Sequence, residues 1–203
     1  MRQRFAPIVG ASVQRYGPGE EVLDPQPGDF ILTHGDDWTS KLIWFGQGLR
    51  FFGKDRKYAY WTHTAILVDE RGGIIEAIGN GVKPGHISKY KDIEYHLVRL
   101  GTTADGMDRH EAVNFARWSL NEPYGRLTIV SIAIGLITGG RLTFGYEGQA
   151  ICSGLVSRSL ERTEAIFDRS PTDIMPADLA KYYGAVPPSP GTPNGTLRQR
   201  VAA

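Results

Sequence analysis

The sequence has only one cysteine, Cys152, among its 203 residues. A single thiol excludes a disulfide framework within the chain and any zinc site built from several cysteines. The sequence also lacks an excess of charge of either sign, because it has 23 lysine and arginine residues and 22 aspartate and glutamate residues. So even a balance produces no broad electrostatic field, and nucleic acid is not expected as a partner.

Long apolar runs are missing as well. The longest, residues 127–138, is interrupted by Gly135 and is too short to cross a bilayer, so we expect a buried helix there and no transmembrane segment. Residues 1–7 lack the apolar core of a secretory signal. We therefore expect a protein that is cytoplasmic, or that is exported or carried in a virion without a recognisable signal peptide.

The length and the composition, with 41% apolar residues, predict one globular domain, and its predicted strands and helices, given below, make the expected class α+β. Residues 1–23 are polar without a clear period, which predicts an N-terminal extension before a domain over residues 24–184. Residues 185–203 are rich in proline and glycine and predict a flexible C-terminal tail.

Strands and helices are predicted from the spacing of apolar residues and from turn signals. The predicted strands cover residues 30–32, 64–68, 73–78 and 95–99. The predicted helices begin after Asp37, at the capping-box spacing of residues 108–111, at Cys152 and near Met175. The first of these helices is expected to bury Leu42, Ile43, Phe45 and Leu49.

Residues 50–60 interleave aromatic and basic side chains. Such a run could touch phosphates or a membrane surface. We favour a loop between a helix and a strand with its aromatic rings folded inward.

Cys152 stands at the start of a segment with apolar residues at positions 151, 155, 156 and 160, which is helical spacing on one face. In the first turn of a helix, unpaired N–H groups and the positive end of the helix dipole favour a thiolate over a thiol. The same N–H groups can stabilise an oxyanion during acyl transfer. The alternative is that Cys152 is a small buried hydrophobic residue.

A nucleophilic cysteine needs a base, and all five histidines precede Cys152 in the chain. His86 and His110 are expected at the surface, and His96 fits either the core or the surface. His34, just beyond the first strand, cannot be ranked from spacing.

His63 is the strongest candidate because its surroundings predict a geometry. A four-residue turn over residues 69–72 would pair residue 65 with Glu76. Side chains alternate along a strand, so His63 and Glu76 would then share one face, where the carboxylate could orient the imidazole. A loop of odd length would put them on opposite faces, and a lone glutamate in a strand more often faces solvent.

Three motifs together resemble the NlpC-type branch of the papain-like cysteine hydrolases. They are Gly28-Asp29 before a strand, His63 at the start of the next strand, and the run from Cys152 to Val156. Tyr124, after a proline, is similar to a Pro-Tyr motif of that family. The histidine strand precedes the cysteine helix, as in the circularly permuted subgroup of YiiX-like and YaeF-like proteins.

The resemblance implies a papain-like permuted NlpC-type fold, with a small, curled antiparallel sheet packed on helices. It implies a thiol hydrolase in which Cys152 attacks an amide or ester, His63 is the base and Glu76 orients it, without a metal or an organic cofactor. Tyr124 and Ser153 are candidates for substrate or oxyanion contacts. The substrate would be a cell-wall peptide or an acyl or lipid conjugate, and peripheral membrane contact stays open.

The alternative is a non-catalytic module that binds lipid or peptide on the same fold. The sequence makes no prediction of the oligomeric state.

Overall fold

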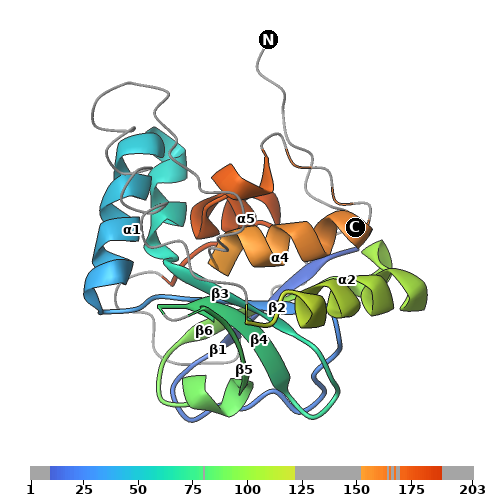
Figure 1. Cartoon of the computed structure of the whole chain (residues 1–203). Helices are drawn as coiled ribbons and strands as arrows, with labels where there is room; N and C mark the ends of the chain where they lie inside the picture. The colour runs from blue at the N-terminus through green and yellow to red at the C-terminus, as the bar shows by residue number, and fades with distance from the viewer. Residues whose placement is uncertain are drawn as a thin grey trace.

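A curled antiparallel sheet of six strands forms the centre of the protein in the computed structural model (Figure 1). The structure describes residues 10–79, 81–121, 152–163, 165, 167 and 170–188. The predicted α+β class is confirmed. The expected helix over 127–138, Tyr124 and most of the expected tail lie outside the described residues.

The strands are β1 (Ser12–Tyr16), β2 (Phe30–Thr33), β3 (His63–Leu67), β4 (Gly73–Ile78), β5 (Gly81–His86) and β6 (Tyr95–Arg99). The α-helices are α1 (Trp38–Arg50), α2 (Gly106–Trp118), α4 (Cys152–Leu160) and α5 (Pro176–Tyr182). Short 3₁₀ segments are η1 (Gly53–Tyr60), η2 (Ile87–Tyr90), η3 (Gly101–Thr103), η4 (Glu161–Thr163) and η5 (Pro171–Asp173). The strand order in the sheet is β1-β6-β2-β3-β4-β5.

Both faces of the sheet are buried, because successive residues of its strands enter two different core clusters. In β2, Phe30 belongs to the larger cluster and Ile31 to the smaller one. The larger cluster also takes side chains from α2, α4 and α5, which lie on the same side of the sheet (Figure 1). The smaller cluster includes Tyr90 of η2 and lies on the other face.

The predicted hairpin is confirmed in its register. Strands β3 and β4 pair Ile66 with Ile75 and Leu67 with Ile74, and Val68 N–H donates to the carbonyl of Gly73 at 2.8 Å. The turn over residues 69–72 therefore has the even length on which the predicted proximity of His63 and Glu76 depends.

The sheet extends beyond the predicted strands at both edges. Strand β1 pairs with β6 inside the segment expected to be an N-terminal extension. Its residues are all partly exposed and only two are apolar or aromatic, so no apolar run marked it. Strand β5 contains Gly81, Pro84 and Gly85 and was not predicted. Among the described strands it pairs only with β4. Proline is tolerated at such an edge because the edge strand leaves N–H groups unpaired.

The domain also reaches past the predicted boundary at residue 184. Ala185 is fully buried, and its carbonyl accepts a hydrogen bond from Trp61 Nε1 at 2.8 Å. A single alanine in a proline-rich context gave no sign of burial in the sequence.

Helix α1 is capped as predicted but faces the other way. Ser40 N–H donates to Asp37 Oδ1 at 2.6 Å. On the expected apolar face, Leu42, Ile43 and Leu49 are half-buried and Phe45 is exposed. The buried residues of α1 are instead Ser40, Gly46 and Gln47. The prediction failed because hydrogen bonds, rather than apolar packing, fix this helix to its neighbours.

Helix α2 begins nearly one turn earlier than predicted. Asp105 is the N-cap and Asp108 occupies the third helical position, so Asp108 is the second partner of the capping box rather than its first. No helix among residues 10–121 and 152–188, as far as these are described, is long and apolar enough to cross a membrane.

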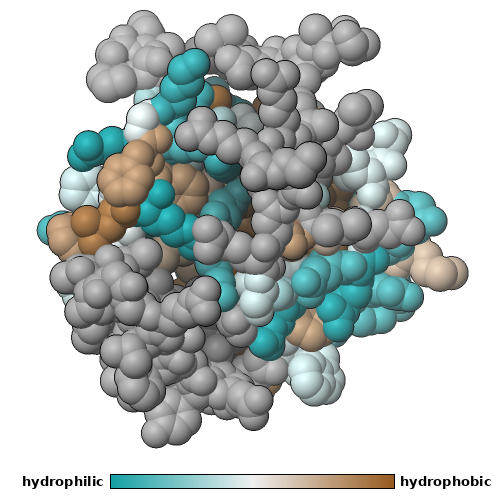
Figure 2. Space-filling model, turned by 90° about the horizontal axis from the view of Figure 1, so that it is seen from above, coloured by the Kyte–Doolittle hydropathy of each residue, from teal (hydrophilic) through white to brown (hydrophobic). Residues whose placement is uncertain are grey.

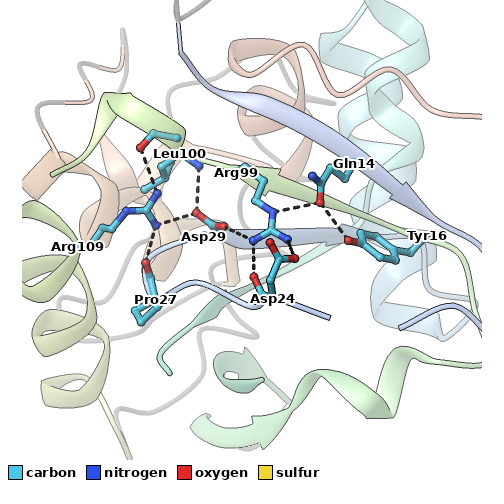
Figure 3. Close-up of polar contacts among 9 residues, drawn as sticks. Gln14, Tyr16, Asp24, Pro27, Asp29, Arg99, Leu100 and Arg109 are labelled. Atoms are coloured by element: carbon cyan, nitrogen blue, oxygen red, sulfur yellow. Dashed lines mark hydrogen bonds and ion pairs between the residues drawn. The ribbon is translucent and has the colours of Figure 1, made fainter. Parts of the chain in front are cut away.

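A fully buried carboxylate, Asp29, ties the sheet to α2 (Figure 3). Its Oδ1 accepts hydrogen bonds from Arg109 Nη1 at 2.9 Å and from Leu100 N–H at 3.0 Å. Its Oδ2 lies 3.4 Å from Arg99 Nη1. Gly28 has φ +88°, and a Cβ there would lie 3.3 Å from Arg109 Cγ, so glycine suits this turn.

We expect Asp29→Asn to lower the free energy of unfolding by about 3 kcal/mol or more, because it removes the buried carboxylate that pairs with Arg109 and one of the two carboxylates that pair with Arg99. Asp24→Asn is the matched control, since Asp24 pairs with the same Arg99 but its side chain is 75% exposed. It should cost less than about 1 kcal/mol. Urea unfolding of both variants measures the difference, and equal losses would contradict the role assigned to Asp29.

Candidate active site

Cys152 is the first residue of α4, as predicted, and its side chain is 2% exposed. The helix packs against β3 and β4. Because Cys152 lies in the first turn, the unpaired N–H groups of that turn are next to its thiol. A negative charge that develops there would be stabilised.

His63 is the first residue of β3 and lies between the other two predicted residues, Cys152 and Glu76. Its Nε2 lies 2.8 Å from Glu76 Oε2, so the predicted pair is brought together. The Cys152 side chain also interacts with the imidazole of His63. Because Nε2 is committed to Glu76, Nδ1 is the ring nitrogen left for the thiol.

Glu76 is buried in the sheet, with 2% of its side chain exposed, and three side chains hydrogen-bond to it. Tyr90 OH donates to Oε2 at 2.6 Å, His63 occupies the same oxygen, and Lys89 Nζ donates to Oε1. A buried carboxylate is stable only with such partners. The predicted orienting carboxylate is thus itself held in place by η2.

Sequence reasoning missed Lys89 and Tyr90. Both lie in η2, which follows the unpredicted strand β5. Nothing in their spacing from Glu76 indicated a contact, because the contact depends on β5 folding back along β4.

These contacts shift the pKa values of the pair in opposite directions. Burial alone would lower the pKa of His63, but hydrogen bonds and negative charge from Cys152 and Glu76 outweigh it and raise that pKa to about 9. Burial would raise the pKa of Glu76, but His63, Lys89 and Tyr90 lower it to about 2. The pKa of Tyr90 is raised, first by burial and then by Glu76, so its hydroxyl stays protonated and donates.

The shifts define a pH window for stability. Because the folded-state pKa of His63 lies above its ordinary value of 6.5, its contribution is complete below about pH 6.5 and is lost as the pH rises through 9. Because the pKa of Glu76 lies below its ordinary value of 4.5, its contribution is present above pH 4.5 and is lost as the pH falls toward 2. Both contributions are therefore complete between pH 4.5 and 6.5.

The side chain of Ser153, next to Cys152, has a partner within the protein. It is fully buried, and its Oγ donates to the carbonyl of Ile174 at 2.6 Å. The hydroxyl thus fixes the start of α4 to the segment before α5, and the predicted substrate or oxyanion contact of Ser153 stays a prediction. The contact with Ile174 was not predicted because it joins residues 21 positions apart in the chain.

The remaining histidines lie elsewhere. His34 is partly buried, stacks on Tyr60 and has its Nδ1 2.5 Å from the Tyr60 carbonyl. His96 is buried, and burial followed by the charge of Arg15 lowers its pKa to about 4. His86 and His110 are exposed, in agreement with the prediction. Of the five histidines, all of them among the described residues, His63 is the one on which Cys152 acts, so His63 is the candidate base.

The site contains a thiol, an imidazole and a buried carboxylate, which are the groups that a thiol-dependent acyl transfer requires. Among the described residues, no group of three or more histidine, cysteine, aspartate or glutamate side chains could hold a metal ion. Comparison with protein-family models and with curated proteins gives no match for this chain.

We expect Glu76→Gln to lower the pKa of His63 from about 9 toward or below 6.5, because the amide keeps an acceptor but loses the negative charge. An NMR titration of the imidazole nitrogens measures the shift. Glu70→Gln, on the exposed turn of the same hairpin, is the matched control and should leave the titration of His63 unchanged. An unchanged titration in Glu76→Gln would show that Glu76 does not set the charge of His63.

Proposed function

We propose that this protein is a cysteine hydrolase that cleaves an amide or ester bond with Cys152, His63 and Glu76. The observation that carries the proposal is the position of His63, which hydrogen-bonds to Glu76 at 2.8 Å and also interacts with the single cysteine, at the start of α4. Burial of Glu76 with three donors supports it, because a fully held carboxylate keeps the imidazole in one orientation.

In the proposed reaction, the Cys152 thiol proton passes to His63, and the sulfur attacks the substrate carbonyl carbon. The oxyanion is stabilised by N–H groups of the first turn of α4. His63 returns the proton to the leaving amine or alcohol as its bond to the carbonyl carbon breaks, which leaves a thioester on Cys152. Water then attacks the thioester carbon while His63 takes a proton from it. The bond to the Cys152 sulfur breaks, His63 returns the proton to the sulfur, and the acid leaves the restored thiol.

The pKa of His63 suits both halves of this reaction. Acylation removes the charge of Cys152 and its hydrogen bond, two of the causes that raise that pKa. The imidazole of the acyl-enzyme is then easier to deprotonate, so it can act as a base toward water.

We further propose the circularly permuted NlpC-type papain-like fold. It is supported by the positions of the three motifs in space: Gly28-Asp29 leads into the central strand β2, His63 opens the neighbouring strand β3, and Cys152 opens the helix that packs on β3. The substrate class stays as the resemblance implied it, a cell-wall peptide or an acyl or lipid conjugate.

The second candidate function is a non-catalytic module that binds lipid or peptide. The low exposure of Cys152 favours it, because a structural cysteine is also buried.

Alkylation of Cys152 by iodoacetamide at pH 7 distinguishes the two candidates. Because the chain has one cysteine, mass spectrometry of the intact protein reports this site alone. We expect rapid labelling of the protein and slow labelling of His63→Ala, since the variant has no base for the thiol proton. His110→Ala, an exposed histidine in α2, is the matched control and should label like the unchanged protein.

We also expect His63→Ala to lower the hydrolysis rate of an activated acyl ester by about 10²–10⁴-fold without changing the near-UV circular dichroism. The acyl-enzyme should be seen as a mass increase on the unchanged protein. Slow labelling in both forms, without a covalent intermediate, would favour the binding module. Loss of labelling in His34→Ala but not in His63→Ala would assign the base to His34.

A further inference from the structure

Helix α1 turns its polar side inward and its apolar side outward. Gln47, fully buried, donates from Nε2 to the carbonyls of Ala59 and Trp61 at 3.2 and 2.8 Å. Its Oε1 accepts from Ala177 N–H at 2.8 Å. Surface helices usually do the reverse and bury an apolar stripe, so the outward side of α1 calls for an explanation.

The outward side carries an apolar stripe, which we define as Trp38, Leu42, Phe45 and Leu49. These positions are spaced by four, three and four residues and so share one face of the helix. Trp38 is 63% exposed and Phe45 is 49% exposed, while the two leucines are partly exposed. Trp44 and Phe52, 51% and 71% exposed, extend the apolar surface beside the stripe.

This gathering is unusual for the molecule. The exposed large aromatic residues of the described chain are Trp38, Trp44, Phe45, Phe52 and Trp118. All but Trp118 belong to α1 or to the residue before η1. Seen from above, apolar side chains gather on the side of the molecule where α1 stands, with hydrophilic side chains next to them (Figure 2).

The charges beside this surface are mainly positive. The exposed cations of α1 and η1 are Lys41, Lys54, Arg56 and Lys57. The acidic residue between them, Asp55, is paired with Lys181 at 2.6 Å. The exposed carboxylates Asp36 and Asp37 lie at the other end, before α1, and Asp37 caps the helix.

The same segment lies next to the candidate active site. Thr33, the last residue of β2, pairs with His63, the first residue of β3. The chain between them forms α1 and η1, so both elements leave and rejoin the sheet at the end that holds His63.

We propose that α1 and η1 form a docking surface for an anionic lipid bilayer. Tryptophan and phenylalanine on an exposed helix, flanked by lysine and arginine, are the side chains that enter the boundary of headgroups and acyl chains. Bases beside them attract acidic headgroups and weaken in salt. Docking is independent of the proposed hydrolysis, although it would hold the candidate active site close to the lipid surface.

Co-sedimentation with vesicles of phosphatidylglycerol and phosphatidylcholine tests the proposal, with pure phosphatidylcholine vesicles as the neutral comparison. We expect the full chain to bind the anionic vesicles more tightly, and less so at high salt. Replacing Trp38 and Phe45 together by serine should weaken binding about tenfold or more. Trp118→Ser, at a tryptophan of α2 that is 74% exposed, is the matched control and should bind like the unchanged protein.

Charge is tested in the same assay. The pair Lys54→Glu and Arg56→Glu should weaken binding to anionic vesicles and reduce its salt dependence. Lys91→Glu, at an exposed lysine outside α1 and η1, is the control and should change neither. Cys152→Ala should bind normally, so loss of hydrolysis and loss of docking are separate results.

Several outcomes would overturn the proposal. They are no binding to anionic vesicles, equal binding to neutral ones, or equal weakening by Trp118→Ser. A dimer seen by analytical ultracentrifugation, abolished by the serine pair and accompanied by no vesicle binding, would assign the apolar stripe to contact between two copies instead.

Discussion

Two buried carboxylates hold the sheet at opposite ends of β3, and each is stable only because donors surround it. Asp29, whose carbonyl accepts from Leu67 N–H at 2.7 Å, collects two arginines. Glu76 collects His63, Lys89 and a tyrosine. A buried charge without partners would cost several kcal/mol, so both clusters restrict how the strands and their flanking segments can be arranged. One cluster fixes the fold, and the other fixes the imidazole beside the thiol.

The sequence predicted the parts of the structure that follow from local periodicity. The turn of even length gave the register that unites His63 and Glu76, and the helical spacing placed Cys152 in a first turn. It did not predict Lys89 and Tyr90, because their contact with Glu76 needs an edge strand whose proline and glycines resemble a loop. Long-range contacts of this kind are set by tertiary packing, which no local pattern records.

Helix α1 shows a different limit. Its apolar spacing was recognised, but spacing reports only that one face is apolar, not which way that face points. The direction was decided by Gln47, whose hydrogen bonds to three backbone groups hold the opposite face inward. The buried amide of Gln47 therefore leaves the apolar face of α1 at the surface, where it can contact a partner, instead of in the core. The same pattern supports the proposal of a lipid surface, and it could not have done so from the sequence alone.

Strand β5 has a consequence for how the molecule behaves in a crowded solution. Open strand edges invite pairing with another chain, which leads to fibrils and precipitates. Pro84 removes one N–H from this edge, and Lys83 places a charge on it. The irregular composition that concealed the strand from prediction thus also discourages self-association through added strands. A regular, easily recognised edge would have been the more hazardous one.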